Sequence, residues 1–346
     1  MIHRVFAFAG IAVLAVVLSA PANAGTIYNF TSFDGPGNNG GGTTVNGINN
    51  NGDVVGFSSD NAANPTLLTN FIRGANGAFT TLNIGGFPLA MAIGINAIGD
   101  VTGTSNGSAF LLFNGLFSLL PPVSNTTLNE TAFGLNDGGP GGLVVGQFLD
   151  GNTGNTPGFL FGTGGFTTLI PNIAAIVTNA QGVNNHGLVT GFWSADGVHQ
   201  HGFFYNSTTQ QFALPADPNV PNLFLTQFLG INDNGLAVGY YQLPDGSQHG
   251  FLYNTTSQSY TFLDDPSAAV NGVSITQITG VTNAGEIAGF YVDAAAGLQR
   301  GFIATPGSAA TAAPEPGTFG LLLASLIPIV FARWWDRRFR LSRTGR

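Results

Sequence analysis

One stretch decides the fold of this chain: Gly230-Ile231-Asn232-Asp233-Asn234-Gly235-Leu236-Ala237-Val238-Gly239-Tyr240-Tyr241. Near-copies of this stretch, which we call the marker, recur along the chain. Their first residues are Gly47, Gly94, Gly134, Gly182, Gly230 and Gly280. Successive copies lie 40 to 50 residues apart. A repeat of this length indicates an architecture built from equivalent supersecondary units.

The centre of the marker, Asn-x-x-Gly, predicts a tight turn between two strands, because Asn and Gly accept the positive φ that such turns require. After the turn, an apolar residue and a glycine share one strand face, as Val54 and Gly56 do. We expect this glycine to let a neighbouring sheet approach closely. The acid of the marker is not retained, because Ala97 and Asn185 stand where Asp233 does. We therefore interpret the marker as the hairpin that builds each repeat.

Two further apolar signatures follow the marker. The first has the copies Phe71-Ile72-Arg73, Ala109-Phe110-Leu111-Leu112, Gly158-Phe159-Leu160-Phe161, His201-Gly202-Phe203-Phe204-Tyr205, His249-Gly250-Phe251-Leu252-Tyr253 and Gly301-Phe302-Ile303. The second occurs in five repeats, at 79–82, 117–120, 166–169, 212–214 and 260–263. Each repeat thus holds about four short strands, which is typical of a β-propeller blade.

The sixth repeat lacks the last apolar piece, and the N-terminal region supplies a similar one. Tyr28-Asn29-Phe30 resembles Tyr260-Thr261-Phe262, and each precedes a marker by about the same distance. We therefore predict an all-β, six-bladed β-propeller over residues 25–305. Its N-terminal strand completes the last blade, which removes the free sheet edges.

Composition excludes several classes of function. The chain has no cysteine, so it can form neither disulfides nor thiolate metal sites, and it has no cysteine nucleophile. Residues 25–313 contain two arginines, no lysine and fifteen acidic residues. Because nucleic-acid binding depends on Lys and Arg contacts to phosphate, we predict no nucleic-acid partner.

The N-terminus has the features of a secretory signal peptide over residues 1–24. Arg4 provides the basic region, residues 5–18 form an apolar run, and Ala22-Asn23-Ala24 is a small-residue cleavage site. We therefore expect export through the Sec machinery. A permanent N-terminal anchor is the alternative, although the apolar run is short for a membrane span.

The C-terminus has three parts in series. A linker of small residues (306–313) leads to Pro314-Glu315-Pro316, and an apolar run at 319–332 follows. The tail then carries the arginines Arg333, Arg337, Arg338 and Arg340. We predict a short transmembrane helix whose basic end stays in the cytoplasm, which leaves the propeller outside.

This arrangement at 314–346 resembles the PEP-CTERM sorting signal. The resemblance rests on Pro314-Glu315-Pro316, the short hydrophobic segment and the arginine-rich end, in that order. It implies a Gram-negative bacterium that makes exopolysaccharide, with an exosortase as partner. It also implies transient anchoring in the inner membrane, removal of the tail, and delivery to the cell surface or matrix. A plain C-terminal anchor is the alternative.

The repeats also resemble the extracellular HAF-type repeat family, named for a His-Ala-Phe motif. The copies nearest to that motif are His201-Gly202-Phe203 and His249-Gly250-Phe251, and Ser108-Ala109-Phe110 keeps its last two residues. The other repeats lack the histidine. Because repetition rather than an activity defines this family, the resemblance implies the architecture and no reaction.

Two groups of residues are candidate metal ligands. Asn49-Asn50-Asn51-Gly52-Asp53 and Asn232-Asp233-Asn234-Gly235 are rich in oxygen ligands, so bound calcium is possible, but turn chemistry accounts for the same residues. His199, His201 and His249 would suit a zinc ion. No acid stands at a fixed offset from these histidines, so we expect each to bond a backbone carbonyl. We predict no metal site and no cofactor.

The sequence shows no catalytic constellation. Asp217, Asp264 and Asp265 stand beside prolines in predicted turns, and no nucleophile motif occurs. We predict a non-enzymatic binding or structural module associated with exopolysaccharide or biofilm. A polysaccharide lyase or hydrolase that uses acids around the central channel is one alternative. A self-assembling coat protein is the other.

Overall fold

The structure is a computed structural model that describes residues 27–307, apart from 62–64, 172–173, 269–272 and 294. The predicted signal peptide, most of the linker and the predicted sorting signal with its transmembrane helix lie outside these residues. The sorting motif Pro314-Glu315-Pro316 and the four tail arginines therefore stay predictions. Within the described ranges, no helix combines the length and apolar character needed to cross a membrane.

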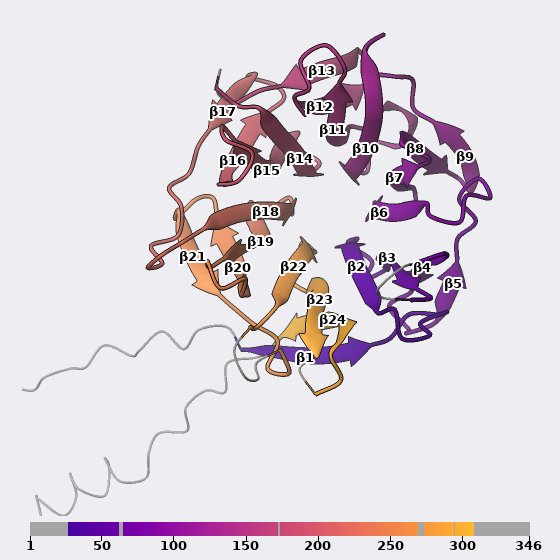
Figure 1. The fold of residues 1–346 in the computed structure, drawn as a ribbon, viewed down its shortest axis with the longest axis vertical. Helices are drawn as coiled ribbons and strands as arrows, with labels where there is room; N and C mark the ends of the chain where they lie inside the picture. Colours follow the sequence, from indigo (N-terminus) through magenta and orange to yellow (C-terminus); the bar gives the residue numbers. More distant parts are fainter. Residues whose placement is uncertain (1–26, 62–64, 172–173, 269–272, 294, 308–346) are drawn as a thin grey trace, which may run out of the picture. The chain divides into compact units, whose positions relative to one another are not determined.

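The described chain folds into six four-stranded antiparallel sheets arranged around a central channel, which confirms the all-β six-bladed propeller (Figure 1). Blade 1 consists of β2 (Thr43–Ile48), β3 (Val54–Ser59), β4 (Leu68–Arg73) and β5 (Phe79–Thr81). Blade 2 consists of β6 (Met91–Ile95), β7 (Val101–Ser105), β8 (Ser108–Phe113) and β9 (Leu116–Leu119). Blade 3 consists of β10 (Thr127–Leu135), β11 (Val144–Asp150), β12 (Gly158–Gly162) and β13 (Gly165–Leu169), with a short 3-10 helix at Gly139–Gly141.

The remaining blades follow the same plan. Blade 4 consists of β14 (Val177–Val183), β15 (Leu188–Ser194), β16 (His201–Asn206) and β17 (Gln211–Ala213). Blade 5 consists of β18 (Leu225–Ile231), β19 (Leu236–Gln242), β20 (Gln248–Asn254) and β21 (Ser259–Phe262). Blade 6 consists of β22 (Thr276–Val281), β23 (Ile287–Asp293), β24 (Leu298–Pro306) and β1 (Tyr28–Phe33). The marker forms the first hairpin of each blade, as predicted.

The predicted ring closure is confirmed. Strand β1 pairs antiparallel with β24, from Tyr28 opposite Pro306 to Phe33 opposite Gly301. The rings of Phe30 and Phe302 lie 5.2 Å apart between their centroids. The first strand of the propeller thus becomes the outer strand of its last blade, and β22 packs against β2 to complete the circle.

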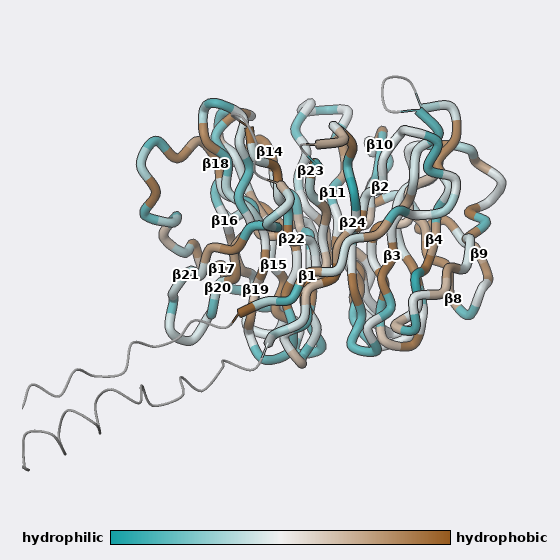
Figure 2. Tube along the Cα trace, turned by 90° about the horizontal axis from the view of Figure 1, so that it is seen from below, coloured by the Kyte–Doolittle hydropathy of each residue, from teal (hydrophilic) through white to brown (hydrophobic). Residues whose placement is uncertain are grey.

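A phenylalanine in the third strand of each blade forms the centre of the core. All six have no exposed surface: Phe71, Phe110, Phe159, Phe203, Phe251 and Phe302. Seen from the side, hydrophobic residues lie along the strands, whereas many of the hydrophilic ones lie in the loops at the two ends of the strands (Figure 2). Because burying one such side chain contributes about 1.5–3 kcal/mol, these repeated residues stabilise each blade individually.

The glycine after the turn has a different neighbour from the one predicted. A Cβ atom at Gly56 would overlap the carbonyl oxygen of Thr44, which belongs to the innermost strand of the same blade. It would also lie 3.1 Å from the ring of Phe71 in the third strand. The predicted approach of a neighbouring sheet is therefore wrong at this position. The glycine instead makes room within its own blade for the buried phenylalanine.

Candidate functional site

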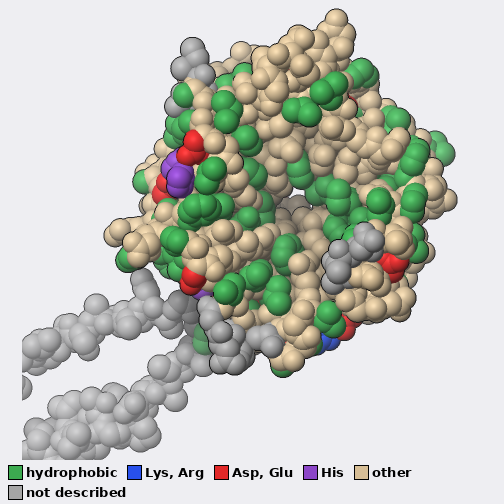
Figure 3. All heavy atoms as spheres, in the orientation of Figure 1, with side chains coloured by type: hydrophobic (Ala, Val, Ile, Leu, Met, Phe, Trp, Pro, Cys, Tyr) green, Lys and Arg blue, Asp and Glu red, His purple; other side chains and the backbone are tan. Residues whose placement is uncertain are grey.

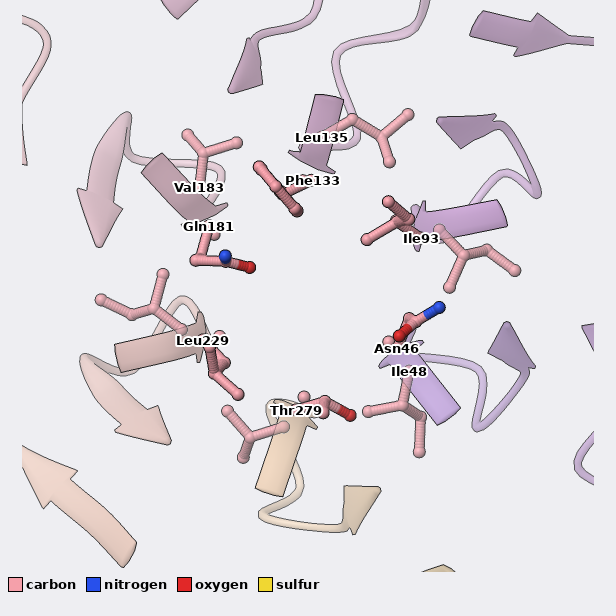
Figure 4. Close-up of a pocket in the computed structure, with 18 residues that line it drawn as sticks. Asn46, Ile48, Ile93, Phe133, Leu135, Gln181, Val183, Leu229 and Thr279 are labelled. Atoms are coloured by element: carbon pink, nitrogen blue, oxygen red, sulfur yellow. The ribbon is translucent and has the colours of Figure 1, made fainter. Parts of the chain in front are cut away.

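The innermost strands β2, β6, β10, β14, β18 and β22 line the central channel with two rows of side chains (Figure 4). The first row is the residue before each marker glycine: Asn46, Ile93, Phe133, Gln181, Leu229 and Thr279. The second row is the residue after it: Ile48, Ile95, Leu135, Val183, Ile231 and Val281. The second row is entirely apolar, whereas the first mixes amide, hydroxyl and apolar groups.

A β-bulge in every innermost strand shapes the first row. In β2 the pairing with β3 passes from Val45 directly to Gly47, so Asn46 has no partner on the second strand. The same shift recurs at the equivalent place in the other five blades. A bulge leaves one residue unpaired and bends the strand. The bulged residue is therefore the one whose identity can vary without disturbing the blade.

The marker glycines let adjacent blades approach at the channel wall. A Cβ atom at Gly134 would lie 2.5 Å from the carbonyl oxygen of Gln181 in the next blade, and one at Gly94 would lie 2.7 Å from that of Phe133. Real Cβ atoms do not approach backbone this closely, so a side chain here would push the blades apart. The channel between the two rows is correspondingly narrow, with a cavity of about 80 Å³.

Six turn residues form a ring at the narrow mouth of the channel, which we call the marker ring. Its members are Asn50, Ala97, Asp137, Asn185, Asp233 and Asn283. In five of the six steps, a backbone N–H of one blade donates to the side-chain Oδ1 of the next, at 2.7–2.9 Å. The step from Asn50 to Ala97 has no such bond, because alanine offers no oxygen. The ring of backbone-to-side-chain bonds therefore joins every pair of neighbouring blades except blades 1 and 2.

Side-chain amides strengthen the ring around Asp233. Asn185 and Asn283 both donate from Nδ2 to Asp233 Oδ2, at 3.0 and 2.8 Å. Burial alone would raise the pKa of Asp233, but the hydrogen bonds from Asn283 and Asn185 outweigh it and lower the pKa. The carboxylate is thus held ionised as an acceptor between two blades.

The wide mouth opposite the marker ring holds a larger cavity of about 360 Å³, which we call the cup. Its lining consists of Asn46, Phe57, Met91, Ile93, Thr131, Phe133, Gln181, Gln227, Leu229, Gln277, Thr279 and Phe290. None of these lining residues carries a charge. Amides, hydroxyls and phenyl rings therefore meet in one cavity whose size falls in the range of small-molecule sites.

Glutamines connect the cup to the outer part of blades 4 to 6. Gln277 donates from Nε2 to Gln248 Oε1 at 2.7 Å, and Gln248 donates onward to Gln242 at 3.0 Å. Gln227 donates to Gln200 in the same way. The bonds of Gln277 and Gln227 cross from one blade to the next, so they hold these two amide groups of the cup in fixed orientations.

Three equivalent side-chain pairs, each joining a carboxylate to a histidine or an arginine, lie beyond these glutamines, one in each of blades 4, 5 and 6. His201 Nδ1 lies 2.7 Å from Asp217 Oδ2, and His249 Nδ1 lies 2.7 Å from Asp264 Oδ2. In blade 6 an arginine replaces the histidine: Arg300 Nη2 donates to Asp34 Oδ2 at 2.9 Å. We call these the rim pairs.

An aromatic residue of the second strand lies opposite the histidine or arginine of each rim pair. Trp193 faces His201, Tyr241 faces His249 and Tyr291 faces Arg300 in the strand register. The ring centroids of Trp193 and His201 lie 5.6 Å apart, and those of Tyr241 and His249 lie 5.1 Å apart. Figure 3 shows histidine beside acidic side chains over blade 4 on the face that it views.

No protein-family model matches the chain, and no curated protein matches it. Among solved structures, the fucose-specific lectin from Aleuria aurantia is 9% identical, with 69% of this chain and 77% of that chain covered and a TM-score of 0.39. An oligogalacturonate lyase from Vibrio parahaemolyticus is 12% identical, with coverage of 80% and 96% and a TM-score of 0.40. The β-propeller domain of the Trilobed protease from Pyrococcus furiosus is 9% identical, with coverage of 76% and 95% and a TM-score of 0.36. Likenesses this low assign neither ligand nor reaction.

The histidines differ from their predicted surroundings. His201 and His249 pair with carboxylates rather than backbone carbonyls, and these carboxylates do stand at a nearly fixed offset, 16 and 15 residues later. His199 pairs separately with Asp196 at 2.7 Å. The expectation that each of these histidines bonds a backbone carbonyl is therefore wrong. A loop that differs by one residue between blades 4 and 5 concealed the offset.

The candidate calcium loops use their oxygens within the fold. Asn49 Oδ1 accepts the N–H groups of Asn51 and Asp53, and Asn49 Nδ2 donates to the carbonyl of Asn96 in the next blade. Asn232 makes the equivalent bonds, including one to the carbonyl of Thr282. Among the described residues, no three side chains of His, Asp or Glu gather as metal ligands.

The remaining predicted acid, Asp265, is almost completely buried at 1% exposure. Its Oδ1 accepts the N–H of Ser267, while Oδ2 has no hydrogen-bond partner among the described residues. Burial raises the pKa of this carboxyl, and the nearby Asp293 raises it further. Asp265 does not belong to the lining of the cup. No acid of the described chain belongs to the lining of the cup.

Proposed function

We propose that this protein is exported and that its propeller binds polysaccharide at the cell surface or in the extracellular matrix, with the cup as the binding site. The observation that carries the proposal is the chemistry of the cup. It combines amide and hydroxyl groups with Phe57, Phe133 and Phe290 and has no charged lining residue.

These groups suit a saccharide. The C–H faces of a sugar ring pack on phenyl rings, while its hydroxyl groups exchange hydrogen bonds with amides. Two glutamines of the cup, Gln227 and Gln277, are already oriented by Gln200 and Gln248, which lowers the entropy lost when a ligand binds. The acidic propeller, with two arginines against fifteen acids, would repel an anionic polymer and favour a neutral one.

Export and sorting rest on the two ends of the sequence. The signal peptide at 1–24 directs the chain to the Sec machinery. The PEP-CTERM-like signal at 314–346, with its short transmembrane helix, makes the chain a substrate of an exosortase. HAF-type repeats agree with an extracellular location. The inner membrane then holds the chain only until the tail is removed.

Binding is tested by retention of the purified full chain, in detergent, on the exopolysaccharide of the organism that makes it. Phe57→Ala should weaken retention at least tenfold, because it removes one aromatic wall of the cup. Leu116→Ala, at a side chain that is 74% exposed on an outer strand, is the matched control and should leave retention unchanged. No retention of the unaltered chain on its own polysaccharide would refute the proposal.

Sorting is tested separately. Pro314-Glu315-Pro316 is replaced by three alanines, and the tail is followed by mass spectrometry of the exported protein. We expect the replaced chain to keep its tail and to stay in the inner membrane. Unchanged cleavage and delivery would show that no exosortase reads this motif.

A secreted polysaccharide lyase or hydrolase is the second candidate, and the rim pairs favour it. In His201 and His249 a carboxylate occupies Nδ1, which leaves Nε2 to exchange a proton with a ligand. This role requires turnover of the polysaccharide, measured by release of reducing or unsaturated ends. Loss of that turnover in Asp217→Asn would establish the enzyme, and absence of turnover in the unaltered chain would reject it.

A further inference from the structure

One of the three rim pairs differs from the other two. In blade 4, Trp193, His201 and Asp217 form what we call the blade 4 cluster. His201 lies between the other two side chains, in ring contact with Trp193 and bonded through Nδ1 to Asp217 Oδ2. The side chain of His201 is 47% exposed, against 23% for His249 at the equivalent place in blade 5.

Two polar atoms of the blade 4 cluster lack hydrogen-bond partners. They are Trp193 Nε1, which can only donate, and Asp217 Oδ1, which can only accept when ionised. Both atoms are buried. Buried polar groups are nearly always paired in folded proteins, so an unpaired donor and an unpaired acceptor on either side of one histidine call for an explanation.

The equivalent carboxylates in blades 5 and 6 are satisfied. Asp264 accepts the N–H of Gly250 through Oδ1 at 3.0 Å and pairs with His249 through Oδ2. Asp34 accepts Nε and Nη2 of Arg300 through its two oxygens, at 3.1 and 2.9 Å. The open hydrogen-bonding capacity is therefore a property of blade 4 and not of the repeated arrangement.

We propose that the blade 4 cluster is a second saccharide subsite, separate from the cup, which binds a hydroxyl group of a neutral sugar. A hydroxyl is the simple group that can accept from an N–H such as that of Trp193 Nε1 and can donate to a carboxylate oxygen such as Asp217 Oδ1. The sugar ring then packs on the indole, which supplies an aromatic face. Because both atoms are covered, a neighbouring side chain has to shift before the sugar can reach them. The inference rests on the proposed saccharide binding but concerns a different surface.

Trp193 provides a direct readout of this subsite. The chain has three tryptophans, and the other two, Trp334 and Trp335, lie in the C-terminal tail. In the full chain carrying Trp334→Phe and Trp335→Phe, the emission of Trp193 is titrated in detergent with the methyl glycosides of glucose, galactose, mannose and rhamnose. We expect at least one glycoside to produce a saturable change in emission.

Two substitutions in that background decide the role of the carboxylate. Asp217→Asn should weaken binding of the responding glycoside at least tenfold, equivalent to about 1.4 kcal/mol. Asp264→Asn is the matched control at the equivalent position in blade 5, and its affinity should stay within twofold. If circular dichroism shows that Asp217→Asn is unfolded, Trp193→Phe is measured by calorimetry instead, because it removes the indole N–H while keeping an aromatic ring.

Each outcome bears on the proposal. An emission of Trp193 that none of the four glycosides changes overturns it, and so does equal weakening by Asp217→Asn and Asp264→Asn. Phe57→Ala separates the subsite from the cup. If this variant abolishes retention on polysaccharide while Trp193 still responds, both sites are supported as independent. If Trp193 responds and Phe57→Ala has no effect, the subsite stands and the cup fails as the proposed binding site.

Discussion

The marker glycines should differ in how much an added methyl group destabilises the propeller, in an order set by their distance from the next blade. A Cβ at Gly134 would lie 2.5 Å from a backbone oxygen, whereas one at Gly47 would lie 3.2 Å from the nearest one, the carbonyl of Ile93. The first distance requires the two blades to separate. The second requires a shift of only a few tenths of an ångström.

The expected magnitudes follow from two opposing terms. Overpacking of this kind costs about 1–3 kcal/mol. Replacing glycine by alanine also restricts the unfolded chain, which stabilises the fold by about 0.4–1 kcal/mol. Gly134→Ala should therefore lose about 1–2 kcal/mol of unfolding free energy, while Gly47→Ala should be close to neutral. For a unit of this size, with an unfolding entropy of about 2.1 cal/mol/K per residue, the difference corresponds to about 2–3 °C in Tm.

The assay is thermal and urea unfolding of the full chain in detergent, followed by circular dichroism, for both variants and the unaltered protein. Gly94→Ala, with 2.7 Å to the carbonyl oxygen of Phe133, should fall between the two. If Gly47→Ala is as destabilising as Gly134→Ala, the blades do not meet at these glycines with the spacing described. The marker glycines would then not set the width of the channel.

Three further predictions concern the ring and its closure. Ala97→Asn supplies the missing acceptor for the N–H of Asn50 and should raise the unfolding free energy by about 0.5–1 kcal/mol; urea titration showing no gain would mean that the joint is already satisfied. Deletion of residues 25–33 removes the outer strand of blade 6 and should lower Tm by at least about 5 °C, since it uncovers a core phenylalanine and a sheet edge; an unchanged melt would contradict closure by that strand. Asp233→Asn should destabilise the fold by about 1–2 kcal/mol at pH 7, because asparagine has one oxygen acceptor and an NH2 donor in place of the second oxygen. The lowered pKa of Asp233 stabilises the fold above the pKa of the unfolded chain and ceases to do so as pH falls through the folded value, so the two proteins should converge in acid; a gap that widens on acidification would reverse this reasoning.

Local chemistry explains why the fold was predictable. The turn of each marker depends on residues that are adjacent in sequence, as with Asn49 accepting from Asn51 and Asp53. The likeness of Tyr28-Asn29-Phe30 to a later strand was also visible without the structure, and β1 indeed pairs with β24. These patterns can be recognised in the sequence because each recurs in all or nearly all of the six repeats.

The residues of the channel and the marker ring were less predictable, because they occupy equivalent positions in the blades but differ in residue type. The bulged row contains Asn46, Ile93 and Phe133, which have no chemical property in common, and nothing in the pattern marks a register shift. Comparing Asp233 with Asn185 by charge concealed their shared feature, an Oδ1 oxygen that accepts from the preceding blade. The marker therefore builds the hairpin and also fastens one blade to the next.

The pairing of β1 with β24 imposes an order of events on the making of this protein. Tyr28 is among the first residues of the propeller to be synthesised, and its partner Pro306 is the last residue of the final strand. Blades 1 to 5 each contain all four of their strands in one continuous segment and can form as soon as that segment is complete. Blade 6 alone takes one strand from the start of the chain, so it cannot be completed until β24 has been synthesised. Until that moment the circle is open, so any chain cut short before β24 carries an unpaired leading strand.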